Sequence, residues 1–289
     1  SKKEKMTTQC LYPQAENVGL LKMDLLNIKN LYVITKIMQE CNDVNDKLRT
    51  MDGVQELLKD PRIFQEIFST GRTKGIFQFE SPGMIQMNMD FQPESFEDTI
   101  ILVAAYRPGP MDFIPEIIAE KWWRKLGEKS PFGKPNHSIQ IKHEKLQTIL
   151  EPTYGVPIYQ EQIMKIVQEL AGYNMADADN IRKYMSKKLT VLLEKERGFF
   201  IHGSEYVIGQ ANEKLTNLKA IEHPSEEQVN EMNQLEADIK KMPTYIKGCV
   251  PNGICSAEEA DHFFDVMMNF GLYAFNKSHA LCYAQVAMY

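Results

Sequence analysis

The chain has 289 residues, of which 43% are hydrophobic and 25% are charged, and its formal net charge is −6. This length allows one large domain or two ordinary ones, and the composition excludes an intrinsically disordered chain. The acidic balance disfavours a protein that binds nucleic acid over its whole surface. It still permits a local basic patch that contacts phosphates.

Cysteine usage and hydropathy indicate the cellular setting. The five cysteines include no C-x-x-C pair, so we expect reduced thiols and a cytoplasmic protein. A zinc site made of Cys249, Cys255 and His262 is disfavoured by its spacing. The longest apolar stretch, 100–106, is too short to span a membrane. The chain starts without methionine and stops within an apolar run, so we expect a fragment of a longer protein.

In chain order, the patterns predict a mainly α-helical protein with a few short β-strands, an α+β class. Residues 19–26 are expected to form a buried strand or a strand edge, and alternating polarity over 75–79 predicts a second strand. Ser256 and Glu259 have the spacing of a capping box, which predicts the start of a helix that runs to Phe270. The other expected helices cover residues 27–40, 54–69 with a break at Pro61, 94–106, 114–126, 160–170, 176–187 and 191–201.

Residues 208–242 contain two apolar runs with spacings of three and four, separated by His223, Pro224 and Ser225. The first run is Ile208, Ala211, Leu215, Leu218 and Ile221, and the second is Val229, Met232, Leu235, Ile239 and Met242. This pattern predicts an antiparallel helical hairpin with charged outer faces. Two roles stay open for it, a solvated arm without chemistry and a docking surface for a protein partner.

The segment Lys22-Met23-Asp24 is the first that could carry chemistry. In a strand, Lys22 and Asp24 share a face. A carboxylate beside an ammonium group suits a site that binds Mg²⁺ and a polyphosphate, because the carboxylate holds the metal and the lysine neutralises phosphate charge. The alternative is an ordinary surface ion pair.

A second candidate is Arg107, at the end of a predicted helix and before the stiff turn Pro108-Gly109-Pro110. A guanidinium held by a rigid backbone suits the recognition of phosphate or carboxylate. The alternative is an arginine that satisfies the last carbonyls of its helix.

A third candidate is the basic stretch 182–197, with six basic and two acidic residues. Lys183 and Lys187 are four residues apart and share a helix face, with Arg182 adjacent. The repulsion between Lys183 and Lys187 destabilises the helix by about a few tenths of a kcal/mol unless a nearby anion compensates it. Contact with a triphosphate or the DNA backbone is therefore plausible on chemical grounds, and a solvated basic face is the alternative.

The fourth candidate is the polar segment Asn276, Lys277, Ser278 and His279, between an aromatic-rich stretch and an apolar run. It offers hydrogen-bond donors, one positive charge and one flat ring within four residues. These groups could hold the base, sugar and phosphates of a nucleotide. The alternative is the capped start of a helix.

Six segments in this order resemble one family closely, the bacterial C-family DNA polymerases of the DNA polymerase III alpha type. They read GLLKMDLL, TKGIFQFES, ESFEDTIILVAAYRPGP, EPTYGVPIYQEQIMKI, ADADNIRKYMSKK and AFNKSHA. The resemblance implies that 1–30 are the C-terminal end of a palm domain and 31–289 a helical fingers domain. Residues 204–247 are then an inserted hairpin. Shorter family members join the flanking motifs F-I-x-G and G-C-V-x-N-G-I almost directly, so the ends of the insertion should lie close together.

The resemblance also implies catalytic roles. Polymerases of this family hold two Mg²⁺ ions on three palm carboxylates, and the last lies in a K-x-D element. Asp24 matches that metal ligand, and Lys22 matches a phosphate contact. The other two carboxylates belong to an earlier D-x-D element, which does not precede Lys22 in this chain. We therefore expect the chain alone to be inactive.

Further residues match the family's nucleotide-binding positions in the fingers. Arg182 and Lys183 match a basic pair that meets the triphosphate, and Lys187 shares the helix face of Lys183. Family members usually have two arginines followed by alanine, whereas this chain has Lys183 and Tyr184, so a bidentate contact at 183 is in doubt. Arg107 matches the R-P-G-P turn, and the residues that match the segment near the nascent base pair are Asn276, Lys277, Ser278 and His279.

The predicted function is part of a replicative DNA-directed DNA polymerase that binds the incoming dNTP and primer-template DNA for two-metal nucleotidyl transfer. Other replisome subunits are expected partners, among them the sliding clamp, whose binding region lies outside this chain. One alternative is a non-catalytic DNA- or partner-binding module of the replication machinery, with the acidic hairpin as its docking element. A second is a different phosphoryltransferase or nucleotidyltransferase that uses the same Lys-x-Asp strand without template DNA.

Overall fold

The computed structural model describes residues 9–21, 28–40, 50–136, 142–271 and 274–289. It divides the chain into two units, Ser1–Asn45 and Asp46–Tyr289. The first unit contributes the helices α1 (Tyr12–Asn17) and α2 (Lys29–Glu40), and no residue of α2 is buried. The predicted boundary between palm and fingers at residue 30 stays a prediction.

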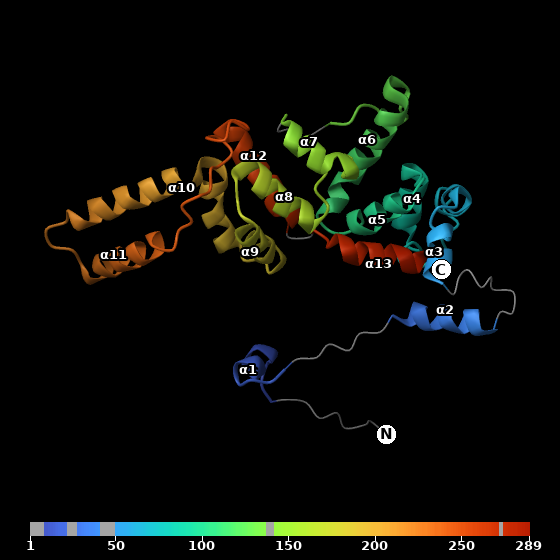
Figure 1. Cartoon of the computed structure of the whole chain (residues 1–289), viewed down its shortest axis with the longest axis horizontal. Coiled ribbons are helices and arrows are strands. Elements are labelled where there is room, and N and C mark those ends of the chain that lie inside the picture. Colours follow the sequence, from blue (N-terminus) through green and yellow to red (C-terminus); the bar gives the residue numbers. More distant parts are fainter. Residues whose placement is uncertain (1–8, 22–27, 41–49, 137–141, 272–273) are drawn as a thin grey trace. The chain divides into compact units, whose positions relative to one another are not determined.

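The second unit is built from helices joined by turns and longer loops (Figure 1). Its longer α-helices are α4 (Pro82–Phe91), α5 (Phe96–Ala105), α6 (Ile114–Leu126), α8 (Gln160–Ala171), α9 (Met175–Ser186), α10 (Thr190–Lys219), α11 (Glu226–Ile239), α12 (Ala257–Gly271) and α13 (Lys277–Ala287). Its shorter elements are α3 (Met51–Leu57), the π-helix η2 (Ile63–Phe68), η3 (Pro110–Phe113), η4 (Gly127–Lys129), α7 (Glu144–Leu150) and η5 (Glu151–Thr153). None of the helices in the described ranges is long and apolar enough to cross a membrane.

The expected α+β class is wrong, because the described ranges contain helices and turns but no strand. The only β-type pairing in them is an isolated parallel bridge between Tyr159 and Phe275. The predicted strand at 75–79 is a series of turns, in which the Phe79 N–H donates to the Ile76 carbonyl at 3.0 Å and Gln78 has a φ of 70°. These turns bury Phe79 and expose Gln78, which accounts for the alternating polarity of this segment without a strand. The other predicted strand, 19–26, lies mostly outside the described residues.

Local signals explain where the helices begin. Side chains of Ser81, Ser95, Asn174 and Ser225 accept hydrogen bonds from backbone N–H groups in the first turns of α4, α5, α9 and α11. Such caps satisfy donors that a helix start leaves without an intrahelical partner. The capping box predicted at Ser256 is confirmed, because its hydroxyl accepts the backbone N–H of Glu259 at 3.2 Å and its own N–H donates to the Glu259 carboxylate.

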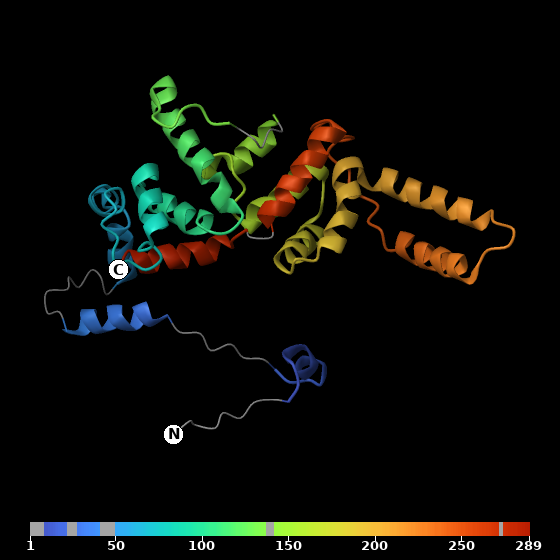
Figure 2. The ribbon, with the colours of Figure 1, turned by 180° about the vertical axis from the view of Figure 1, so that it is seen from behind.

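The core of the second unit includes α5. Residues 98–105 of this helix are all buried, as expected for a helix that is covered on every side. α13 packs along α5, and α8 packs against α7 and α9. Figure 2 shows α13 and α5 together from behind. Because α13 lies along α5, the first turn of α13 and the turn after α5 face the same region.

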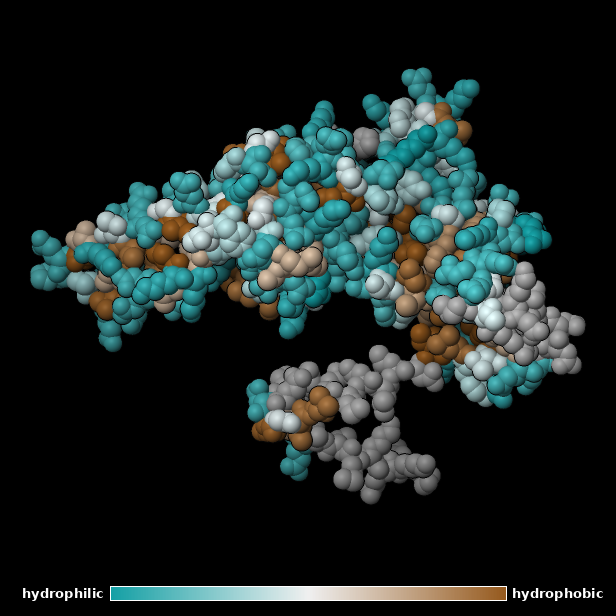
Figure 3. All heavy atoms as spheres, in the orientation of Figure 1, coloured by the Kyte–Doolittle hydropathy of each residue, from teal (hydrophilic) through white to brown (hydrophobic). Residues whose placement is uncertain are grey.

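The predicted hairpin is present as an arm that projects from the other helices of the second unit (Figures 1 and 2). α10 is kinked at Gly203, and the part after the kink runs beside α11. Lys214 and Lys219 of α10 form ion pairs with Glu231 and Glu236 of α11, the first at 2.7 Å. Figure 3 shows hydrophobic side chains between hydrophilic ones along the arm.

The two ends of the arm meet in space, as the flanking motifs predict. The Ser204 N–H donates to the Ile246 carbonyl at 2.8 Å, and the Val250 N–H donates to the Ile201 carbonyl at 3.0 Å. The helical path can therefore leave the body of the unit and return at nearly the same place. That the arm is an insertion relative to other family members stays a prediction.

Candidate functional site

Arg107 lies where α5 ends and the chain turns sharply. Its N–H donates to the Ala105 carbonyl at 2.8 Å, and its carbonyl accepts the Met111 N–H at 2.9 Å. Gly109 has a φ of 93° and a ψ of −77°, a conformation that favours glycine. Pro110 then opens η3. These contacts fix the backbone on both sides of Arg107, so the turn determines where its guanidinium points.

The structure brings Arg107 to the start of α13. The guanidinium carbon lies 3.7 Å from the centre of the Phe275 ring, a close cation–π contact. Arg107 is half-buried, and no described carboxylate forms an ion pair with it. Burial lowers the pKa of Arg107, and the nearby Tyr283 opposes that shift. An arginine remains charged under these conditions, so the site holds a positive charge without an anionic partner among the described residues.

An aromatic row continues from Phe275 along α13. Its ring centre lies 5.1 Å from that of His279, and the His279 and Tyr283 rings are 4.5 Å apart. The Phe77 ring packs on Tyr283 at 5.2 Å. We call Phe77, Arg107, Phe275, His279 and Tyr283 the aromatic cluster. Three segments that are far apart in the sequence thus meet at one face of α13.

The segment Asn276, Lys277, Ser278 and His279 forms the exposed first turn of α13 and its cap. The Asn276 side chain accepts the backbone N–H of His279 at 3.0 Å, so the alternative of a capped helix start is correct for this residue. The Lys277 ammonium lies 5.5 Å from the Tyr159 ring centre and forms no ion pair within the described residues. Lysine and histidine side chains are therefore available to a ligand here.

Arg182 and Lys183 of α9 share one anionic partner. The Arg182 Nε lies 2.7 Å from Asp179 Oδ1, and the Lys183 Nζ lies 2.8 Å from Asp179 Oδ2. Hydrogen bonds from Lys183 and then Arg182 lower the pKa of Asp179. Asp179 of the same helix therefore offsets part of the repulsion expected between Lys183 and Lys187. Lys187 forms no ion pair among the described residues.

α9 lies against α12, the helix that precedes α13 in the chain. A Cβ added to Gly271 would lie 2.1 Å from the Met185 sulfur, so these helices approach each other closely. This contact fixes α9, which carries Arg182 and Lys183, against α12.

The predicted catalytic pair Lys22 and Asp24 lies outside the described residues, so the structure does not test its geometry. Within the described ranges, no group of three His, Cys, Asp or Glu side chains could hold a metal ion. The residues described do not fit a complete Mg²⁺ site.

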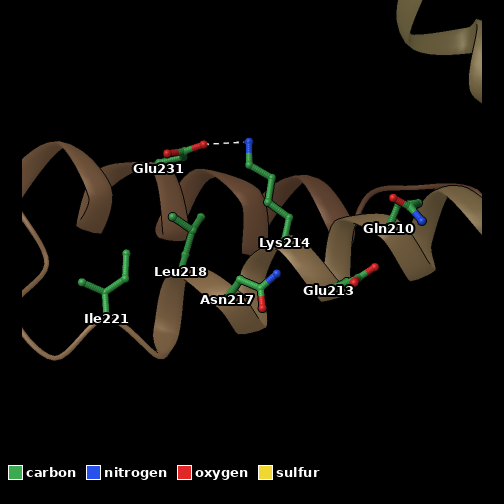
Figure 4. A pocket seen from close by; sticks show the side chains of 7 residues that line it. All are labelled: Gln210, Glu213, Lys214, Asn217, Leu218, Ile221 and Glu231. Carbon is green, nitrogen blue, oxygen red and sulfur yellow. Dashed lines mark ion pairs between the residues drawn. The ribbon is translucent and has the colours of Figure 1, made fainter.

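The arm carries a separate hollow of about 490 Å³ (Figure 4). It is lined by Gln210, Glu213, Lys214, Asn217, Leu218, Ile221 and Glu231. The Lys214–Glu231 ion pair crosses it, and the seam residues Leu218 and Ile221 form its apolar wall. Enclosed ligand sites are mostly apolar with a few convergent polar groups. This groove between two solvated helices lacks that character.

The sequence patterns indicate no role for four further residues that contact α13 or the segment just before it, namely Phe77, Tyr159, Glu161 and Tyr283. One signal is present, because Phe275, His279 and Tyr283 recur at spacings of four, and His279 and Tyr283 share a face of α13. The contacts of Phe77, Tyr159 and Glu161 with α13 have no such local signal.

The comparisons with known proteins agree with the resemblance. Residues 30–206 match the family model described as the bacterial DNA polymerase III alpha subunit finger domain. A DNA polymerase III subunit alpha from Xylella fastidiosa (strain 9a5c) is 31% identical over 277 residues, which are 94% of this chain and 18% of the relative.

Two staphylococcal relatives carry the same name. The one from Staphylococcus epidermidis is 38% identical over 201 residues, 69% of this chain and 17% of the relative. The one from Staphylococcus aureus (strain COL) is 31% identical over 282 residues, 98% of this chain and 21% of the relative. The chain spans about a fifth of the length of these curated relatives. It belongs to the family of bacterial DNA polymerase III alpha subunit finger domains.

Proposed function

We propose that this chain is the fingers part of a replicative DNA-directed DNA polymerase, acting in the cytoplasm, and that it binds the incoming dNTP beside primer-template DNA. One observation carries the proposal. Arg107, a cation without a carboxylate partner among the described residues, stacks on Phe275 at the start of α13. The neighbouring first turn of α13 exposes an ammonium group and an imidazole.

Each group has a chemical task in this proposal. Arg107 and Lys277 neutralise phosphate charge, and Ser278 supplies a hydroxyl donor. The His279 ring, held between Phe275 and Tyr283, offers a face or an edge to the nucleotide. The basic residues Arg182, Lys183 and Lys187 contribute to the triphosphate or to the DNA backbone. Because Asp179 neutralises the first two in part, their contribution is smaller than their charges suggest.

The Asn276 amide has a different task. Both ends of this side chain are occupied, since its oxygen caps α13 and its nitrogen donates to Glu161 at 2.8 Å. We therefore propose that Asn276 holds the nucleotide-binding turn in shape and that the ligand contacts come from its neighbours.

The resemblance implies two Mg²⁺ ions, with Asp24 as one ligand and Lys22 beside the phosphates. The described residues do not form that site, so we assign them no metal-dependent step. Sliding-clamp contact likewise belongs to the full-length polymerase that contains this chain.

In that full-length polymerase, Arg107→Ala is expected to raise the KM for dNTP about 10- to 150-fold. Charge-assisted hydrogen bonds contribute about 1.5–3 kcal/mol, which corresponds to this range. Arg107→Lys keeps the charge but loses the planar fork, so its KM should lie between wild type and alanine. Single-nucleotide incorporation on a primed template measures both. Arg62→Ala is the matched control, because Arg62 is exposed and already pairs with Asp60. Equal KM values for Arg107→Ala and wild type would contradict the assignment.

Asp24→Asn in the full-length polymerase is expected to abolish primer extension while DNA binding is retained, because asparagine keeps the shape but removes the metal-binding charge. Extension and DNA affinity are measured on the same preparations. The 289-residue chain alone should show no template-directed incorporation. Near-normal extension by Asp24→Asn would show that Lys22 and Asp24 have no catalytic role. It would not affect the role proposed for Arg107.

A further inference from the structure

Glu161, in the first turn of α8, is joined to the start of a helix far away in the sequence. Its Oε1 accepts a hydrogen bond from the Asn276 side-chain nitrogen at 2.8 Å. The backbone N–H of Lys277 donates to both carboxylate oxygens, at 3.2 and 3.1 Å. A residue of α8 thus satisfies a free donor at the start of α13, where a negative charge is also favoured by the helix dipole.

Backbone contacts extend this connection into a short ladder. The Phe275 N–H donates to the Ile158 carbonyl at 3.1 Å, and the Gln160 N–H donates to the Phe275 carbonyl at 3.1 Å. The Gln160 side chain donates to the Ala274 carbonyl, also at 3.1 Å. The start of α8 and the approach to α13 are therefore held in register. Glu161 is the charged end of this ladder, and its hydrogen bonds reach past Phe275 to Asn276 and Lys277 at the start of α13.

The position of this carboxylate conflicts with simple electrostatics. Glu161 is exposed, and it contacts the turn that carries Lys277 and His279, to which the proposed function assigns a triphosphate. A carboxylate near a polyanion weakens its binding by direct repulsion. Glu161 therefore favours nucleotide binding only if fixing the geometry of the turn strengthens binding by more than the repulsion weakens it.

We propose that Glu161 is a positioning residue for nucleotide binding: it fixes the first turn of α13, and thereby orients Lys277 and His279 toward the incoming nucleotide. This inference rests on the proposed function. Asn276 transmits the constraint, because the same amide that donates to Glu161 caps the His279 N–H. The contact between Phe275 and Arg107 extends this constraint to the turn after α5.

The test is the direction of change in the KM for dNTP when the full-length polymerase carries Glu161→Gln. Glutamine has nearly the same shape but lacks the charge and replaces one acceptor oxygen by a donor. If Glu161 positions the turn, KM rises about 10-fold and kcat stays within about twofold, because an interaction shared by ground and transition states is weakened. Glu161→Asp keeps the charge, and its shorter reach should give a smaller rise.

Three results would overturn the inference. A lower KM for Glu161→Gln would show that the carboxylate acts only by repelling the nucleotide. An unchanged KM would show that it does not position the turn. A fall in kcat at constant KM, together with a lower melting temperature, would show a purely structural role.

Controls separate this inference from the proposed function. Glu144→Gln removes an exposed carboxylate from the first turn of α7, which packs on α8, and its KM should equal that of wild type. If Arg107→Ala raises KM but Glu161→Gln does not, the proposed function stands and the positioning role fails. If neither variant changes the KM for dNTP, both fail.

Discussion

Lys121→Met is expected to lower the free energy of unfolding of this chain by about 3–5 kcal/mol, the usual cost of removing one partner of a buried ion pair. The Lys121 Nζ lies 2.8 Å from Asp98 Oδ2, and the two side chains are only 7% and 8% exposed. The ammonium also donates to the Gln92 carbonyl at 2.8 Å. Burial lowers the pKa of Lys121, whereas Asp98 favours its charged form. Without the lysine, the Asp98 carboxylate would remain buried without its counter-charge.

Chemical denaturation of the purified 289-residue chain measures this effect, and the chain contains a matched control. Lys125 lies one turn further along α6 and pairs with Glu94, but these side chains are 47% and 54% exposed. Lys125→Met should therefore cost less than about 1 kcal/mol. The double variant Lys121→Met with Asp98→Leu should recover part of the loss, because it leaves no unpaired buried charge. Equal losses for Lys121→Met and Lys125→Met would contradict the prediction.

Gly203→Ala is expected to destabilise the chain by about 2–4 kcal/mol, since it combines backbone strain with a steric clash. Gly203 has a φ of 81° and a ψ of 176°, a conformation available essentially to glycine alone. A Cβ at this position would lie 2.2 Å from the Lys247 carbonyl oxygen, and that oxygen belongs to the backbone. The approach is mutual, because a Cβ on Gly248 would lie 2.3 Å from the Gly203 nitrogen. We therefore expect the segments around Gly203 and Gly248, which meet at the base of the arm, to move apart in this variant.

The control for Gly203 lies in the same helix. Gly209→Ala places its Cβ where nothing lies within 4 Å, at an exposed position of α10. It should stabilise the chain by about 0.5–1 kcal/mol, because alanine favours helix and restricts the unfolded chain. Thermal unfolding and limited proteolysis report both variants. We expect Gly203→Ala to expose the base of the arm to protease and Gly209→Ala to protect it. Similar behaviour of the two variants would show that the kink is not required.

Local features of this protein could be predicted from its sequence. The capping box at Ser256 and the apolar spacing within each helix of the arm involve residues within one or two turns of each other, and the structure contains both the capping box and the two helices. The ion pairs of Arg182 and Lys183 with Asp179 are equally local, since Asp179 lies three and four residues before them. The family resemblance also followed from the order of the motifs alone, and it is confirmed.

Where one segment meets another was decided by tertiary packing. Alternating polarity at 75–79 is compatible with turns as well as with a strand, because either structure can bury Phe79 and expose Gln78. The stacking of Arg107 on Phe275 requires α13 to lie along α5, and the contact of Glu161 with α13 requires α8 to meet the same turn. No spacing along the chain encodes these contacts, because they depend on how the apolar faces of distant helices pack together. The sequence thus determined the helices and the chemical groups they carry, and the packing of the helices determined which groups share a site.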